Sequence, residues 1–148
     1  MLEIVKYESW LNEIQSQSET IRWEEDEIKV GLLTSAYVPS PVNDASWNDV
    51  AQYEIPPCNE YNPGGKQIPN MTQIDENSTR TITGDEVEWL QDVEGFDSAR
   101  YAVIYKDSGQ PATSPLVGFI DFSRLRSNKI RSFIIRWNPL GILRFNWT

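Results

Sequence analysis

Short apolar segments separated by turn-forming residues run through most of the chain, and this pattern constrains the fold more than any other feature. Residues 28–34, 101–105 and 116–122 are mostly apolar, and each is followed by a loop that contains Pro, Gly or Ser. Short strands in succession, without long helices between them, are typical of antiparallel sheets. We therefore expect a mainly β fold, an antiparallel β-sandwich or barrel, as one domain over residues 28–148.

The C-terminal residues predict a β-hairpin. Apolar side chains alternate along residues 130–137 and again along residues 143–147, which places them on one face of each strand. Between these strands, residues 138–141 fit a type I turn with Pro in the second position and Gly in the fourth. Weaker strand patterns occur near residues 71–75 and 79–83.

Residues 1–27 have a different texture and predict an N-terminal arm in a helical or extended conformation. Apolar side chains recur at helical spacing within residues 2–15, and an acidic run follows at 24–27. A helix this short is marginal in water, so the arm needs a surface to lie against. We interpret Trp10 and Trp23 as anchors for another protein surface. The alternative is that both rings pack back onto the same subunit.

Charge is unevenly distributed along a chain whose formal net charge is −9. Residues 1–27 hold eight acidic and two basic side chains, whereas residues 122–148 hold six basic and no acidic ones. The basic candidates for protein interaction are Arg124, Arg126, Lys129 and Arg131. The net negative charge disfavours nucleic acid as a partner, because phosphate binding needs clustered cations. We expect acidic residues 1–27 of one copy to contact basic residues 124–144 of another.

The amino-acid composition excludes most kinds of catalytic site. The chain contains no histidine, which excludes a Ser-His-Asp triad and His-containing zinc sites. Its single cysteine, Cys58, has no partner for an internal disulfide and no histidine to activate its thiol. The acidic residues at 85–88 and 92–94 match no calcium-loop or glycosidase spacing, so we interpret them as surface solvation. We therefore expect no catalytic residues, no metal and no cofactor, and hence no enzyme.

Seven short segments stand in a fixed order between residues 21 and 148. They are residues 28–39 (IKVGLLTSAYVP), 47–50 (WNDV), 61–66 (YNPGGK), 85–89 (DEVEW), 99–105 (ARYAVIY), 115–122 (PLVGFIDF) and 135–143 (IRWNPLGIL). In this order they resemble a family of tailed-bacteriophage virion structural proteins. The resemblance implies a structural role in the particle and supplies no catalytic residues. The chain departs from the family pattern in its basic residues 124–131 and its additional N-terminal residues, where we expect its own contacts.

These features together predict a capsid decoration (cement) protein that binds the outer surface of the major capsid shell and stabilises it. Its expected partners are the major capsid protein and itself, as a homotrimer, on the capsid exterior after assembly in the host cytoplasm. No membrane partner is expected, because no apolar run reaches the roughly 20 residues that span a bilayer. One alternative is a phage tail, baseplate or receptor-recognition component. Another is a carbohydrate-binding or carbohydrate-active domain that would use Glu86, Glu88 and Trp89.

Overall fold

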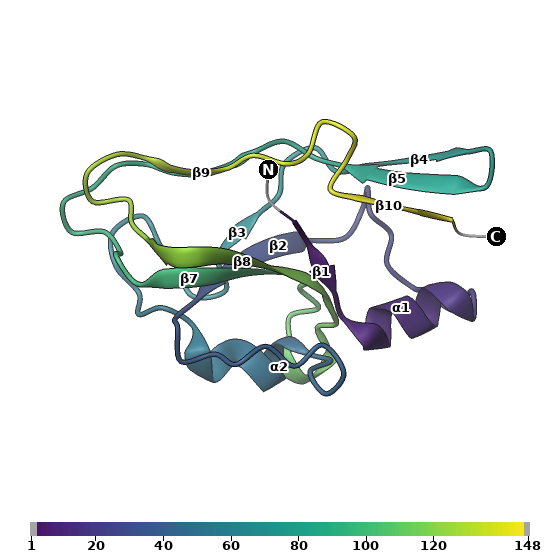
Figure 1. Cartoon of the computed structure of the whole chain (residues 1–148), viewed down its shortest axis with the longest axis horizontal. Helices are drawn as coiled ribbons and strands as arrows, with labels where there is room; N and C mark the ends of the chain where they lie inside the picture. The colour runs from purple at the N-terminus through teal and green to yellow at the C-terminus, as the bar shows by residue number, and fades with distance from the viewer. Residues whose placement is uncertain (1–2, 147–148) are drawn as a thin grey trace.

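The computed structural model describes residues 3–146, and within this range the chain is mainly β (Figure 1). The elements in chain order are β1 (Val5–Lys6), α1 (Glu8–Gln15), β2 (Ile28–Leu33), α2 (Trp47–Val50), η1 (Ala51–Tyr53), β3 (Lys66–Gln67), β4 (Thr72–Glu76), β5 (Thr79–Thr83), β6 (Val87–Trp89), β7 (Ala99–Lys106), η2 (Pro111–Thr113), β8 (Leu116–Arg126), β9 (Phe133–Ile135) and β10 (Leu143–Asn146). All pairings between these strands are antiparallel. The prediction of a mainly β, antiparallel fold is therefore confirmed.

The strands form two layers that face each other across a core (Figure 1). One layer is a five-stranded sheet in the order β1-β8-β7-β2-β3. The other layer consists of the pair β6-β9 and the three-stranded sheet β10-β5-β4. No barrel closes within residues 3–146, so the arrangement is sandwich-like.

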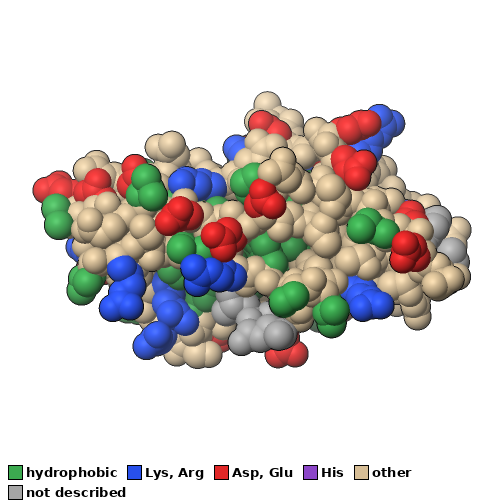
Figure 2. All heavy atoms as spheres, turned by 90° about the horizontal axis from the view of Figure 1, so that it is seen from above, with side chains coloured by type: hydrophobic (Ala, Val, Ile, Leu, Met, Phe, Trp, Pro, Cys, Tyr) green, Lys and Arg blue, Asp and Glu red, His purple; other side chains and the backbone are tan. Residues whose placement is uncertain are grey.

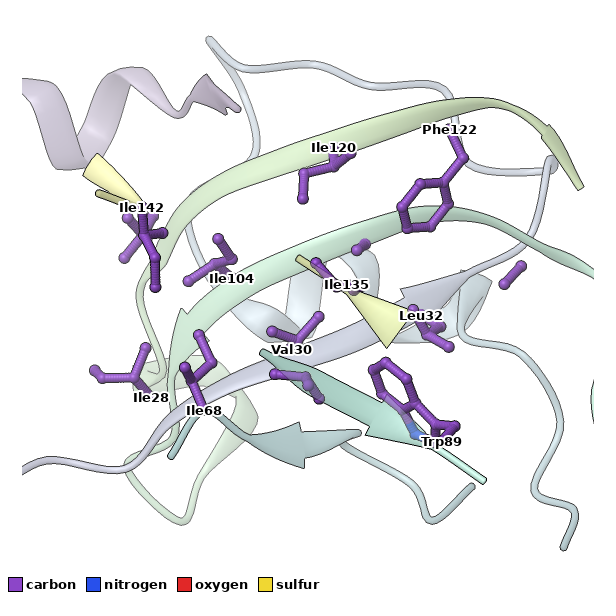
Figure 3. Packing of buried hydrophobic residues seen from close by; sticks show 14 of the residues in the cluster. Ile28, Val30, Leu32, Ile68, Trp89, Ile104, Ile120, Phe122, Ile135 and Ile142 are labelled. Carbon is purple, nitrogen blue, oxygen red and sulfur yellow. The ribbon is translucent and has the colours of Figure 1, made fainter. Parts of the chain in front are cut away.

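Aliphatic and aromatic side chains from both layers fill the space between them (Figure 3). Ile28, Val30 and Leu32 all point into this core from β2, because alternate residues of a strand lie on the same face. Trp89 of β6 and Ile135 of β9 meet them from the other layer and are fully buried. The pair β6-β9 is therefore held to the five-stranded sheet through the core.

The opposite face of the five-stranded sheet is also buried, beneath α2 and the loops around it (Figure 1). Leu33 of β2 and Val103 of β7 belong to this second cluster. The Trp47 ring of α2 stacks on the Tyr105 ring with the two centroids 4.3 Å apart. Gly31 leaves room for Trp47, since a Cβ atom at this position would lie 2.4 Å from the indole. Burial on both faces explains why β2 and β7 are almost entirely apolar.

Residues 1–27 contain the extended and helical conformations predicted from the sequence, but they pack into the domain and do not form a separate arm. In β1, Val5 pairs with Phe119 of β8, so this segment contributes an edge strand to the five-stranded sheet. The helix predicted over residues 2–15 begins only at Glu8, and position 2 lies outside the described residues. The physical reason is that the edge of β8 offers backbone hydrogen bonds, which the helical spacing of the apolar residues does not reveal.

Trp10 and Trp23 are each only 1% exposed, so the prediction that they anchor another surface is wrong for the folded chain. Their rings meet edge to face with centroids 6.2 Å apart. Both indole N–H groups donate to the Glu19 carboxylate, which lies 3.6 Å from the Arg80 guanidinium. The Trp10 ring also packs against Phe145 of β10, with the two centroids 5.2 Å apart. The rings are buried because Arg80 of β5 and Phe145 of β10 supply partners that are distant in the sequence.

The predicted C-terminal hairpin is also wrong. The turn at residues 138–141 forms, and the Gly141 N–H donates to the Asn138 carbonyl at 2.8 Å. However, the strands on either side of this turn have other neighbours, because β9 pairs with β6 and β10 pairs with β5. The turn therefore carries the chain from one sheet to another. Position 147, which we assigned to the last strand, lies outside the described residues.

Candidate protein-interaction surface

The basic residues singled out from the sequence come together where β8 ends and β9 begins. Arg124 and Arg126 are among the last residues of β8, and Lys129 and Arg131 lie in the loop that leads to β9. A groove of about 640 Å³ opens between these elements. Its lining includes Arg124, Arg126, Arg131, Arg136, Leu125, Ile130 and Phe133. Figure 2 shows Lys and Arg side chains gathered toward this end of the molecule, at lower left.

The charges of this groove are largely unbalanced. Arg124, Arg126 and Arg131 make no ion pair with any other residue between positions 3 and 146. Lys129 differs from them, because its ammonium group lies 3.1 Å from the Asp97 carboxylate and outside the groove lining. The described lining includes no acidic side chain. The groove therefore presents uncompensated positive charge on a protein of negative net charge.

Arg126 is the most constrained of these cations. Its guanidinium carbon lies 5.8 Å from the centre of the Phe122 ring. Its Nε atom is buried and has no hydrogen-bond acceptor within the described residues. Burial lowers the pKa of Arg126 below its usual value, and the nearby charge of Arg124 lowers it further. An anion that reached this guanidinium could accept a hydrogen bond from the Nε–H group, and a buried donor without an acceptor is costly. Its negative charge would also offset the repulsion between Arg126 and Arg124.

Exposed aliphatic side chains accompany the arginines. Ile130 is 87% exposed and Leu125 is 54% exposed, and both line the groove. Val93 and Leu90, which are 76% and 54% exposed, lie on the neighbouring loop 90–98. Exposed apolar side chains that gather together mark interaction surfaces more often than ones that occur singly. Sequence reasoning missed these four residues, because Leu125 lies at the end of β8 and the other three lie in loops, where a strand pattern does not reveal which side chains face solvent.

Asn128 joins the two loops that carry this surface. Its side chain is 0% exposed. The Asn128 amide group donates to the Leu90 carbonyl at 2.8 Å, and its oxygen accepts from the Phe96 N–H at 2.8 Å. The Asn128 carbonyl also accepts from the Asp92 N–H at 3.0 Å. A Cβ atom at Gly95 would lie 2.0 Å from the Asn128 side-chain oxygen, so only glycine fits beside it. This network fixes the position of Leu90 relative to the groove.

Two residues of the acidic segment, Asp85 and Glu86, line an open pocket of about 400 Å³ together with Trp137, whereas Trp89 at the end of the segment lies in the core. Asp85, Glu86 and Glu88 are exposed, whereas Trp89 is 0% exposed. The Trp89 ring stacks on Phe133 with centroids 5.8 Å apart. A buried ring has no free face on which a sugar could stack. The carbohydrate alternative therefore loses the aromatic side chain on which it depended.

Cys58 lies partly buried in a loop. Desolvation raises the pKa of its thiol, and the negative charge of Asp92 raises it further. A thiol in these surroundings is a poor nucleophile, because only the thiolate attacks. Within residues 3–146, no three His, Cys, Asp or Glu side chains are grouped so that they could hold a metal ion. Over the same range, no helix combines the length and apolar character that crossing a membrane requires.

Residues 61–66, one of the seven segments singled out from the sequence, make contacts within the fold. Tyr61 accepts from the Leu32 N–H at 2.9 Å and donates to the Glu54 carboxylate at 2.6 Å. The same Glu54 oxygen accepts from the Gly64 N–H at 2.7 Å. At Gly65, with φ of +84°, a Cβ atom would lie 1.8 Å from a backbone oxygen of β2. These residues stabilise the sandwich, and the basic groove lies largely outside the seven segments.

The fold is that of an antiparallel β protein, and its basic, partly apolar groove is the candidate interaction surface. Comparison of the chain with models of known protein families, with curated proteins and with solved structures finds no match. The groove and the charge of the chain are therefore the observations from which a function can be proposed.

Proposed function

We propose that this chain is a non-enzymatic structural protein of a bacteriophage particle, where it decorates the outer surface of the major capsid shell. The observation that carries the proposal is the groove in which unpaired arginines stand beside exposed aliphatic side chains. Arginine is enriched at protein interfaces, and exposed apolar patches mark them. The resemblance to tailed-phage structural proteins is the reason to place the partner in a virion.

The physical advantage of such a protein lies in linkage. A ligand that binds only the assembled shell stabilises that state, and the stabilisation grows with ligand concentration. Many copies on a symmetric shell would reinforce one another if each copy contacts more than one subunit. The net charge of −9 suits an exterior position, because it repels the packaged DNA.

Apolar contacts would supply most of the affinity. Exposed ion pairs contribute only about 0–1 kcal/mol each, so the arginines of the groove mainly provide orientation and specificity. Burial of apolar surface contributes about 25 cal/mol per Å². Since Trp10 and Trp23 are buried within the chain, we assign this contribution to Leu125 and Ile130.

We also propose that the decorating unit is a homotrimer. Glu19 and Asp26 already form ion pairs within the chain, so an intersubunit contact of residues 1–27 would use exposed acids such as Glu8. Sedimentation equilibrium of the purified protein tests this part by itself. A mass of three chains is expected, and a monomer at all concentrations would remove the trimer from the proposal.

Quantitative mass spectrometry of purified particles tests the location. If the chain decorates the head, its copy number should be comparable to that of the major capsid protein. A copy number of only a few per particle would favour the alternative of a tail, baseplate or receptor-recognition component. Absence of the chain from purified particles would contradict both assignments.

A further inference from the structure

We infer that the groove between β8 and β9 holds an extended acidic segment of a partner protein, which adds as a strand to the free edge of β9. This inference deepens the proposed function, because it states what the partner must supply at the groove. It relies on that function only for the identity of the partner. The chemistry of the segment follows from the groove itself.

The first argument is the free strand edge. Among the described strands, β9 has a single neighbour, β6, with Phe133 opposite Trp89 and Ile135 opposite Val87. Phe133 and Ile134 also line the groove, so β9 forms one of its walls. The free edge of a strand presents unpaired N–H and C=O groups, and extended peptides bind to such edges. The groove therefore offers backbone hydrogen bonds as well as side-chain contacts.

The second argument is charge complementarity. Arg124, Arg126 and Arg131 have no acidic partner within the described residues, and the buried Nε of Arg126 has no acceptor. Arg136 pairs with Glu86, but the two side chains are 72% and 53% exposed, so this pair is weak and open to exchange. Guanidinium groups bind carboxylates in a planar, bidentate geometry. Carboxylate side chains of the partner segment therefore match the lining.

The third argument concerns the apolar residues. Leu125 and Ile130 stand exposed in the same lining as the arginines. In an extended peptide, successive side chains point to opposite sides. A segment in which acidic and aliphatic residues alternate can therefore present one kind to the arginines and the other to these aliphatic side chains.

The chain itself does not supply this segment from residues 1–27. That region is acidic, but Trp10 and Trp23 hold it in the core and are each 1% exposed. Its residue Asp26 pairs with Lys106 at 3.3 Å, and β1 is part of the five-stranded sheet. Transfer of this region to another copy would expose both indole rings to water. Residues 1–27 therefore do not leave their own domain to fill the groove, and we assign the groove to a segment of a different protein.

Fluorescence anisotropy with the full-length protein tests the inference. The probe is a short fluorescein-labelled peptide of alternating Glu and Val, and the comparison peptide has Gln in place of Glu. We expect saturable binding of the Glu peptide alone. Arg124→Glu and Arg131→Glu should each weaken this binding at least about tenfold. The matched control is Arg144→Glu, which reverses an exposed charge outside the groove and should leave the affinity unchanged.

Three results would overturn the inference. The first is no binding of the Glu peptide, or equal binding of the Glu and Gln peptides. The second is an equal loss of affinity in Arg131→Glu and Arg144→Glu, which would indicate a general charge effect. The third is tighter binding of a single-stranded oligonucleotide that both groove variants abolish, which would assign the groove to nucleic acid.

A backbone-blocked probe tests strand addition separately. The same Glu peptide, N-methylated at every residue, should lose its binding, because no backbone N–H group remains to donate a hydrogen bond to β9. Unchanged binding of the methylated peptide would contradict strand addition. If the chain bound the Glu peptide but not capsids, the proposed function would be wrong, whereas the inference about the groove would still hold.

Discussion

Asn128 illustrates how a single buried residue can determine the shape of a surface that it does not itself belong to. Its side chain donates a hydrogen bond to the Leu90 carbonyl and accepts one from the Phe96 N–H group. Its backbone carbonyl accepts a hydrogen bond from the Asp92 N–H group. Exposed Leu90 and Ile130 therefore sit on loops with a fixed relative position. Such pre-organisation reduces the entropy that is lost when a partner binds.

Asn128→Ala should lower the free energy of unfolding by about 1–3 kcal/mol, because it leaves a buried donor and a buried acceptor without partners. Urea unfolding followed by tryptophan fluorescence measures the change. Asn48→Ala, at an exposed position of α2, serves as the control and should have a small effect. Equal stability of the two variants would contradict the role assigned to Asn128.

Glu54 gives the fold a specific dependence on pH. Desolvation raises the pKa of its carboxyl group above the usual value, although hydrogen bonds from Tyr61 and Gly64 act in the opposite direction. Because the folded state holds the proton more tightly, the contribution of Glu54 to stability is fully present below the usual Glu pKa, about 4.3. It is lost as the pH rises through the raised folded pKa.

Glu54→Gln should remove this dependence, since a neutral amide oxygen can still accept from Tyr61 and Gly64. We expect the wild type to lose stability relative to Glu54→Gln as the pH rises from about 4 toward neutrality. Urea unfolding at a series of pH values measures the difference. Glu76→Gln, at an exposed position of β4, is the matched control. If the wild type instead became more stable relative to Glu54→Gln as the pH rises, the predicted direction of the pH dependence would be wrong.

At the scale of elements, residues 1–27 belong to the folded domain. The segment supplies β1 to the five-stranded sheet and two indole rings to the core. The contact of Glu19 with both indoles and with Arg80 joins it to β5. Removal of residues 1–27 should therefore destabilise the domain, and the remaining chain should not fold as an independent β unit.

Trp23→Ala isolates this contribution. Truncation of a buried Trp costs about 3–5 kcal/mol, and chemical denaturation measures the loss. Trp137→Ala is the comparison, because the Trp137 ring is only partly buried and should cost less. If the two substitutions had equal effects, the N-terminal segment would contribute little to the core.

Local patterns in the sequence predicted the strands better than they predicted how the strands pair. Residues 28–34 and 101–105 were assigned from their apolar character, and β2 and β7 occupy these positions. The turn at 138–141 was also correct, but its flanking strands pair with β6 and β5. A turn is a local property, whereas the choice of a neighbouring strand depends on contacts that are distant in the sequence.

The candidate surface was predictable only in part, for a similar reason. A run of cations without acids identified Arg124, Arg126 and Arg131. The exposure of Ile130 and the buried network of Asn128 depend on the packing of loop 90–98 against the loop before β9. No linear spacing of residues encodes that contact.

At the scale of the whole molecule, one basic, partly apolar groove stands out on a protein whose net charge is negative. Charge of this kind orients and selects a partner, while the aliphatic side chains hold it. Salt screens exposed charges within a Debye length of about 8–10 Å at physiological ionic strength. If the chain binds the capsid shell as we propose, its affinity should fall with rising salt but should not disappear.

Co-sedimentation with particles that lack the chain measures this salt dependence. Added wild-type protein should bind less tightly as sodium chloride increases. Arg124→Glu should bind weakly at low salt and show a flatter dependence, because it has lost part of the charge that salt screens. An identical salt dependence for both proteins would mean that the groove does not contact the shell.

The central claim is that this chain functions by binding a protein surface of the particle through the groove between β8 and β9. A cryo-electron-microscopy map of the intact particle tests it most directly. We predict density for the chain on the capsid exterior, with Arg124, Leu125 and Arg131 turned toward the shell and an extended acidic segment beside β9. A map in which the groove faces solvent, or in which the chain is absent from the capsid, would contradict the account.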